Sequence, residues 1–345
     1  MQIDLFCQVI DNYGDIGVCW RFARQLVAEH GCQVRLIVDD LGAFRVIAPE
    51  INPRLARQAL LGVEIVPWNA ANTLLPSAVV IEAFACNPPT SYVEAMAALM
   101  PKPVWINLEY LSAEAWVDEI HGMPSEHQRL PLKKYFFCPG FTETSGGVIR
   151  ERVLNKEAPS NRSTALRIFV FAYPHAPVHA LVTVFDAADV TSTVTLAAPI
   201  GDTNPDWKIA PRVAQTQFDA LLATFDFLIV RGEDSFLRAQ WAAKPFLWHI
   251  YPTEDGAHLI KLDAWLDHYC VGLEGSVSEA YRAASHAFNA AKSDATQSAA
   301  FELLAQNIDA LTAHAVLWRS TLTRQTDLAT RLVKFVAAHK GNNLG

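Results

Sequence analysis

The chain has 345 residues, of which 51% are hydrophobic and 19% are charged, and its formal net charge is −8. This length predicts two domains, and the apolar content excludes a chain that is disordered throughout. The acidic balance argues against a nucleic-acid-binding protein, which usually carries a basic excess.

The cysteines and the apolar segments indicate the cellular compartment in which the protein is found. The six cysteines are scattered, with no CxxC pair and no histidine at metal-ligand spacing, which favours free thiols in a reducing compartment over a disulfide framework. No signal peptide opens the sequence, and no run approaches the ~20 apolar residues that a membrane span requires. We therefore expect a cytoplasmic protein that binds neither membranes nor nucleic acid.

Short apolar runs alternate with helical patterns in the first part of the chain. A buried strand is predicted over 2–10, a helix over 17–30 and a second strand over 33–38, and further strands are predicted in VEIVPW, AVVIEAF and PVWINLEY. This alternation favours parallel strands joined by crossover helices, which is a doubly wound sheet. The polar, turn-rich segment 139–163 then predicts an interdomain connection.

A second alternation of the same kind begins at residues 165–173. The elements that follow are helices over 176–187 and 214–224, strands over 191–198, 225–230 and 244–251, and an almost entirely helical pattern from 275 onward. We therefore expect two Rossmann-like α/β lobes that face each other across a cleft, with a helical C-terminal tail. In such sheets ligands bind beyond the carboxyl ends of the strands, so the strand-to-helix loops are the candidate sites.

The loop in FDFLIVRGEDSFLRAQW (225–241) is suited to binding an anion. A strand ends at Arg231, Gly232 supplies a turn, and Glu233, Asp234 and Ser235 open a helix. The backbone N–H groups at a helix start attract anions and Arg231 adds a forked cation, so a diphosphate can bind here without a metal. The alternative is structural: Asp234 or Ser235 caps the helix, and Glu233 is a favourable acid of the first turn.

Aromatic residues follow two other strands of the second lobe. Phe171 and Tyr173 end the strand FVFAY, where they can stack on a nucleobase, although a core position is the commoner fate of each. Tyr251 lies at the turn of WHIYPTEDGAHLIKL (248–262), and Thr253 is a plausible cap of the next helix. His258 has no second ligand at metal spacing, which favours a packing role.

The motifs of several other enzyme classes are missing. The sequence has no GxGxxG after either first strand, no GxxxxGK[ST] and no GxSxG, which disfavours dinucleotide dehydrogenases, P-loop nucleotidases and α/β-hydrolases. It also lacks the Asp-x-Asp triplet with which metal-dependent glycosyltransferases hold a diphosphate. A diphosphate site without a metal ion agrees with that absence.

Two aspartates lie in the first strand-to-helix loop, within VIDNYGDIGVCW (9–20). Asp11 and Asp15 are four residues apart, and Gly14 and Gly17 are expected to allow tight backbone turns. In one reading, Asp15 is the N-cap of a helix that starts near Ile16. In the other, the two carboxylates act together, one as general base on a nucleophile and the other fixing its position. The loop alone leaves both readings open.

Five segments occur in one order over most of the chain: DNYGDIGVCWR, PGFTETSGGVIRE, FVFAY, RGEDSFLRAQWAAKPFLW and IYPTEDGAHLIKL. Together they resemble the EarP family, protein-arginine rhamnosyltransferases that mature bacterial elongation factor P. The resemblance implies a GT-B fold, dTDP-β-L-rhamnose as the donor and no cofactor or metal. It also implies inverting transfer of an α-L-rhamnosyl group to a guanidinium nitrogen of one arginine of the factor, which helps ribosomes through polyproline stretches.

The same resemblance assigns residues to roles. Asp11 and Asp15 match two essential loop aspartates, with Asp15 as the base, and Glu233 matches an essential acid. The rest of the acceptor loop is Asn12, Tyr13, Gly14 and Gly17. The residues implied for the donor site are Phe171, Tyr173, Gln215, Phe218, Arg231, Gly232, Asp234, Ser235 and Tyr251. Thr253 and Arg212 depart from the family pattern, which commonly has a glutamine and an aromatic residue there, so the family's nucleotide contacts are not carried over to them.

The resemblance also divides the chain into an acceptor lobe (1–160), a donor lobe (161–318) and a C-terminal helix (319–345) that packs back on the first lobe. Two aspartates suit an arginine acceptor, because a guanidinium has five N–H donors and pairs with carboxylates. Two rivals stay open: a GT-B enzyme that acts on a small molecule, and a non-catalytic two-lobed binding protein. The second rival gives no reason for three acids in the site loops.

Overall fold

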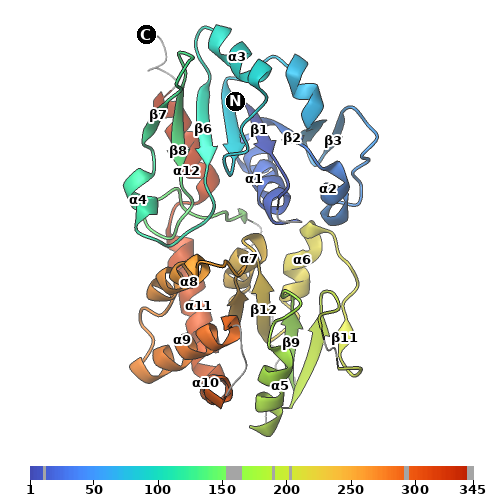
Figure 1. The fold of residues 1–345 in the computed structure, drawn as a ribbon, viewed down its shortest axis with the longest axis vertical. Coiled ribbons are helices and arrows are strands. Elements are labelled where there is room, and N and C mark those ends of the chain that lie inside the picture. Colours follow the sequence, from blue (N-terminus) through green and yellow to red (C-terminus); the bar gives the residue numbers. More distant parts are fainter. Residues whose placement is uncertain (11–12, 153–164, 189–190, 202–203, 291–294, 340–345) are drawn as a thin grey trace. The chain divides into compact units, whose positions relative to one another are not determined.

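The computed structural model describes residues 1–10, 13–152, 165–188, 191–201, 204–290 and 295–339. The chain divides into two compact units. The first unit comprises Met1–Asn155 and Gln325–Gly345, and the second comprises Lys156–Arg324. Figure 1 labels many of the helices and strands of each unit.

The first unit is built on an eight-stranded sheet in the order β3-β4-β2-β1-β5-β6-β8-β7. Its six central strands are parallel, and the edge strands β3 and β7 are antiparallel to their neighbours. The bounds are β1 Gln2–Cys7, β2 Gln33–Val38, β3 Gln58–Leu60, β4 Val63–Pro67, β5 Val79–Ala83, β6 Val104–Leu108, β7 Pro124–Glu126 and β8 Lys133–Phe137. The central strands are apolar over most of their length because both faces of the sheet are covered.

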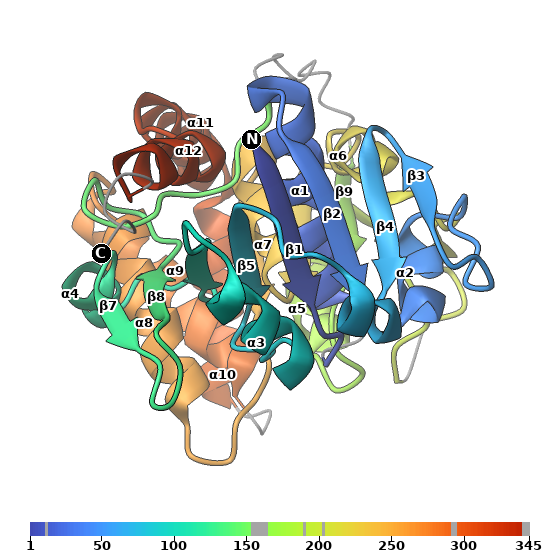
Figure 2. The ribbon, with the colours of Figure 1, turned by 90° about the horizontal axis from the view of Figure 1, so that it is seen from above.

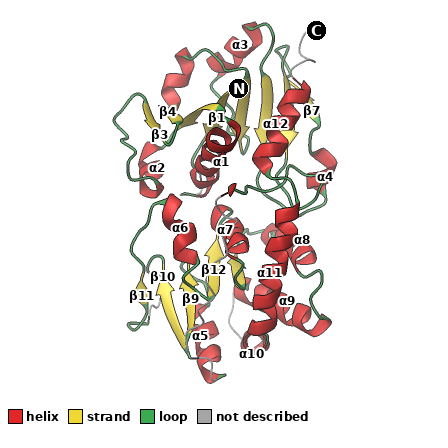
Figure 3. Cartoon of the chain, turned by 180° about the vertical axis from the view of Figure 1, so that it is seen from behind, coloured by secondary structure: helices red, strands yellow, loops and turns green. Residues whose placement is uncertain are grey.

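Helices cover both faces of this sheet. They are α1 Gly14–His30, α2 Leu41–Ile47, the 3-10 helix η1 Trp68–Thr73, α3 Thr90–Ala98, α4 Trp116–Ile120 and α12 Leu328–His339. Helices α1 and α12 pack against each other, and Figure 3 shows both in front of the sheet. In Figure 2, α3 lies on the opposite side of β1 and β5 from α1.

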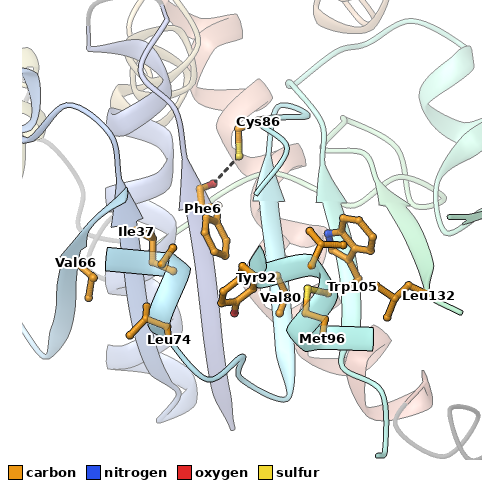
Figure 4. Packing of buried hydrophobic residues seen from close by; sticks show 12 residues of the cluster. Phe6, Ile37, Val66, Leu74, Val80, Cys86, Tyr92, Met96, Trp105 and Leu132 are labelled. Atoms are coloured by element: carbon orange, nitrogen blue, oxygen red, sulfur yellow. Dashed lines mark hydrogen bonds between the residues drawn. The ribbon is translucent and has the colours of Figure 1, made fainter. Parts of the chain in front are cut away.

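The core between the sheet and α3 contains large side chains from successive strands. Phe6 from β1, Val80 from β5 and Trp105 from β6 pack with Tyr92 and Met96 of α3, as Figure 4 shows. The Phe6 ring meets the Tyr92 ring edge to face at 4.8 Å between centroids. This packing fixes β1, β5 and β6 as one rigid element, and it therefore fixes the loops that leave their carboxyl ends.

The segment 139–151, which contains PGFTETSGGVIRE, is held by the two helices α1 and α12. Arg331 of α12 donates from Nη1 to the carbonyl oxygens of Thr142, Glu143 and Ser145. Buried Arg21 of α1 pairs with Glu151 at 2.7 Å. These contacts place the final helix of the chain within the first unit and give this segment a structural role.

The second unit has a five-stranded, all-parallel sheet in the order β11-β10-β9-β12-β13. Its strands are β9 Leu166–Val170, β10 Ser192–Leu196, β11 Lys208–Ile209, β12 Phe227–Arg231 and β13 Phe246–His249. Its helices are α5 Val178–Ala187, α6 Gln215–Leu222, α7 Asp234–Ala242, α8 Ala257–Tyr269, α9 Gly275–Asn289, α10 Ala295–Gln306 and α11 Ile308–Arg324. The position expected for the end of the second lobe, residue 318, lies inside α11, and the units divide after Arg324 instead.

The predicted double α/β alternation and helical C-terminal region are confirmed by these elements. The six cysteines are free and buried. Within the described ranges, no helix has both the length and the apolar character needed to cross a bilayer.

Candidate functional site

Asp15 is fixed by donors from two different loops of the first unit. Helix α1 begins at Gly14 with Tyr13 as its N-cap, so the reading of Asp15 as the N-cap is wrong. Asp15 is 2% exposed. Asp15 Oδ2 accepts from the amide of Ile10 at 2.8 Å, and Oδ1 accepts from the hydroxyl of Tyr110 at 3.0 Å. A carboxylate held on both oxygens has one orientation, as a positioned base requires.

The rest of the predicted acceptor loop is divided between the helix and undescribed chain. Asp11 and Asn12 lie outside the described residues. Gly14 and Gly17 belong to α1, so the expectation that they form tight turns is wrong. The prediction relied on glycine's conformational freedom, but here the helix starts early enough to include both.

Three residues near this loop were missed by sequence reasoning. Asp39, just after β2, accepts the amide of Val9 at 2.9 Å and so anchors the loop that follows β1. Tyr110 follows β6, and its ring stacks on Phe84, which follows β5, at 4.0 Å and 9° between ring planes. Their positions in the sequence could have indicated these residues, because each lies just beyond the carboxyl end of a strand next to β1 or β5.

In the second unit, Arg231 ends β12 and lies over two aromatic rings. Its guanidinium carbon is 4.7 Å from the ring centre of Phe171 and 4.6 Å from that of Tyr173. Gly232 has a φ of 64°, which confirms the predicted turn. Glu233 then occupies the N-cap position of α7 without a side-chain cap bond. The cation and the amides of a helix start therefore lie within the same few residues.

The acids and amide of the predicted donor segment form a partly buried network. Gln215 Nε2 donates to Asp234 Oδ2 at 2.9 Å. Asp234 also pairs with Arg238 at 2.8 Å, and Arg238 pairs with Asp219. Ser235 donates its hydroxyl to the carbonyl of Arg231. Because the N-cap of α7 is Glu233, the capping alternative for Asp234 and Ser235 is wrong.

The predicted aromatic residues gather at the carboxyl ends of β9 and β13. Phe171 meets Phe218 edge to face at 6.3 Å, and Tyr173 meets Tyr251 at 5.5 Å. Tyr173 is 6% exposed, whereas Tyr251 is 60% exposed. The structure thus brings the predicted aromatic residues of the second unit together, with Tyr251 as the ring most open to solvent.

Buried His249 holds the backbone of Tyr173. Its Nδ1 accepts the Tyr173 amide at 3.1 Å. Burial, with smaller contributions from His175, Arg231 and His258, lowers the pKa of His249 to about 3. The ring is therefore neutral at physiological pH, and only a neutral imidazole has an unprotonated nitrogen that can accept a hydrogen bond from the amide.

Two neighbouring positions have structural roles. Thr253 does not occupy the N-cap of α8, which is Gly256, although its Oγ1 accepts the amide of His258 at 3.3 Å. His258 Nδ1 in turn accepts the amide of Thr253 at 3.1 Å. Across the described segments, no group of three or more His, Cys, Asp or Glu residues is arranged to hold a metal ion.

These two sets of residues differ in chemistry. The first unit presents a fixed carboxylate beside an aromatic pair, which suits a cation. The second presents a guanidinium and a helix start beside aromatic rings, which suits a nucleoside diphosphate. Each set lies at the carboxyl ends of parallel strands, where such folds bind ligands.

Comparison with known proteins identifies the family of the chain. The family model described as "Elongation-Factor P (EF-P) rhamnosyltransferase EarP" matches residues 3–206 and 200–337. A protein-arginine rhamnosyltransferase of Pseudomonas putida is 42% identical, over 96% of this chain and 97% of its own length. A relative of the same name from Neisseria meningitidis is 32% identical over 97% of each chain.

Solved structures extend the similarity to the fold. A structure from a study of EarP-mediated arginine glycosylation of elongation factor EF-P is similar with a TM-score of 0.62 and 31% identity, over 98% of this chain and 99% of that chain. The spinosyn forosaminyltransferase SpnP, at 12% identity and a TM-score of 0.56, shares the fold alone. The predicted GT-B glycosyltransferase fold is thereby confirmed, and the chain belongs to the EarP family.

Proposed function

We propose that the protein transfers L-rhamnose from dTDP-β-L-rhamnose to a guanidinium nitrogen of one arginine of elongation factor P, with inversion and without a metal ion. The observation that carries the proposal is the fixed carboxylate of Asp15 in a chain that matches this family over nearly its whole length. A translation factor as acceptor also implies a cytoplasmic location.

The first step is binding of the arginine. A guanidinium has a pKa above ~12, so it arrives protonated and is a poor nucleophile. A carboxylate holds this cation by charge-assisted hydrogen bonds and localises its charge. Asp15 has such a carboxylate, and Asp11 is the second acid of the proposal.

The transfer step then balances as a single displacement. The guanidinium nitrogen forms a bond to the anomeric carbon while the bond from that carbon to the diphosphate oxygen breaks. The electron pair leaves with dTDP, and Asp15 takes the proton from nitrogen as the new bond forms. Attack opposite the leaving group converts the β-linked donor into an α-linked product.

The donor is assigned to the second unit. Arg231 and the amides at the start of α7 stabilise the diphosphate charge, which increases as dTDP leaves. Phe171, Tyr173, Phe218 and Tyr251 supply the aromatic surroundings of the nucleotide. Glu233 is the third essential acid of the proposal.

The alternative is a GT-B enzyme with a small-molecule acceptor. It uses the same donor residues but does not need a protein substrate. Purified elongation factor P, incubated with the protein and dTDP-rhamnose, separates the two functions by mass spectrometry. The proposal predicts a mass gain of one deoxyhexosyl group on an arginine, and unmodified factor beside turnover of a small acceptor favours the alternative.

A further inference from the structure

Three loops of the first unit meet around Asp15. Strands β1, β5 and β6 are adjacent and parallel, so their carboxyl ends lie at the same edge of the sheet. Asp15 follows β1, Phe84 follows β5 and Tyr110 follows β6. The packed core beneath these strands fixes the points from which the three loops leave the sheet.

The Tyr110 side chain links the other two residues. Its hydroxyl donates to Asp15 Oδ1 at 3.0 Å, and one face of its ring is covered by Phe84 at 4.0 Å. Tyr110 is nevertheless 40% exposed, while Asp15 is 2% exposed. An aromatic surface therefore reaches solvent directly beside a buried carboxylate.

The backbone that carries Phe84 is strained. Phe84, Ala85 and Asn87 have φ values of 57°, 53° and 48°, a left-handed conformation that non-glycine residues adopt at a cost in free energy. The surrounding structure maintains it: the Phe84 amide donates to Leu108 at 2.7 Å, and the Ala85 amide donates to buried Asn107 at 3.1 Å. Such over-determined strain tends to occur at functional sites.

We propose that Tyr110 has two roles in acceptor binding: its hydroxyl positions Asp15, and its ring, backed by Phe84, receives the plane of the acceptor guanidinium. The inference rests on the proposed function. A guanidinium is planar, pairs with carboxylates and stacks on aromatic faces. The hydrogen bond from Tyr110 to Asp15 places a carboxylate and an aromatic ring side by side, which are the two kinds of group that such a cation contacts.

The two roles predict different kinetic effects. Tyr110→Phe keeps the ring and removes the hydroxyl, so Asp15 loses one of its donors. We expect kcat to fall roughly tenfold or more, because a misplaced catalytic group is costly. The KM for elongation factor P should change by less than about twofold, since the stacking surface remains.

Tyr110→Leu removes the ring as well. We expect the same fall in kcat and, in addition, a rise in the KM for the factor of about three- to tenfold, as the loss of a cation–π contact implies. Phe84→Leu removes the ring that backs Tyr110 and should raise KM in the same direction. Phe84→Leu leaves the Tyr110 hydroxyl in place.

Tyr92→Phe is a matched control in the same unit. The Tyr92 hydroxyl also donates to a buried aspartate, Asp4, but it lies in the core beneath α3. This control should lower the melting temperature and leave kcat and KM unchanged. A purely structural role for Tyr110 predicts the same behaviour for Tyr110→Phe.

The kinetics of these variants with elongation factor P and dTDP-rhamnose, beside thermal melts, test the inference. A lower kcat with little change in KM for Tyr110→Phe, together with a raised KM for Tyr110→Leu and Phe84→Leu, supports it. A kcat for Tyr110→Phe equal to that of the wild type, or an unchanged KM in both Tyr110→Leu and Phe84→Leu, overturns it while the proposed function stands. A wild-type protein that leaves the factor unmodified overturns both.

Discussion

The guanidinium of Arg231 lies over the ring of Tyr173, 4.6 Å from its centre. This contact orients a cation at the start of α7, and it also leaves Tyr173 almost fully buried. We therefore expect the two side chains to act as one unit in the proposed donor site. It follows that changes to either should affect donor affinity.

Arg231→Ala should weaken dTDP-rhamnose binding by about 1.5–3 kcal/mol, because a charge-assisted contact to phosphate is lost. Tyr173→Leu should weaken binding in the same direction, since it removes the ring that orients Arg231. Calorimetric titration with the donor measures both. Arg167→Ala is the control, because Arg167 pairs with Asp226 outside the donor cluster. Unchanged donor affinity in Arg231→Ala would remove this residue from the donor site.

Asp15→Asn should abolish transfer while donor affinity stays near that of the wild type. Loss of a general base typically lowers the rate by ~10²–10⁴. Asp40→Asn is a matched control, because Asp40 caps α2 by accepting the amide of Ala43 at 2.8 Å and asparagine caps as well. A loss of activity under about tenfold in Asp15→Asn contradicts the role of base.

Activity should survive an excess of EDTA. In the proposed donor site, Arg231 and the helix start take the place of the divalent ion that metal-dependent transferases use. Transfer to elongation factor P, followed by mass spectrometry with and without the chelator, checks this. A loss of turnover that Mg²⁺ or Mn²⁺ restores contradicts the metal-free diphosphate site.

The stability of the protein should fall below pH 6.5 partly because of His249. Its pKa is lowered by burial from the ordinary 6.5 to about 3, so its contribution to stability is present above pH 6.5 and is lost as the pH falls towards 3. The loss amounts to about 2 kcal/mol at pH 5. Denaturant unfolding of His249→Gln should show a flatter pH dependence between pH 7 and 5. His179→Gln, on an exposed face of α5, should keep the wild-type slope.

The fold could be predicted because its signals are local. Buried strands such as Gln2–Cys7 read as apolar runs, and the same alternation with helices occurs twice. The turn at Gly232 was also predictable, since the residue follows a strand and precedes a helix. The contacts of Asp15 were not, because Tyr110 is 95 residues away in sequence. The aromatic residue that ends PVWINLEY has no mark that distinguishes it from a core residue.

Gly14 shows a second limit of sequence patterns. Glycine beside aspartate is typical of a turn, but here it is the first residue of α1. The pairing of Gln215 with Asp234 likewise depends on how α6 and α7 pack, which a single sequence does not reveal. Residue types therefore indicated the loops, while tertiary packing determined which side chains meet.

The most direct measurement is tandem mass spectrometry of purified elongation factor P after incubation with the protein and dTDP-rhamnose. Wild-type protein should add one deoxyhexosyl group to a single arginine, and Asp15→Asn should add none. Factor that stays unmodified under conditions where the donor binds, or a sugar found on a residue other than arginine, would contradict the proposed transfer.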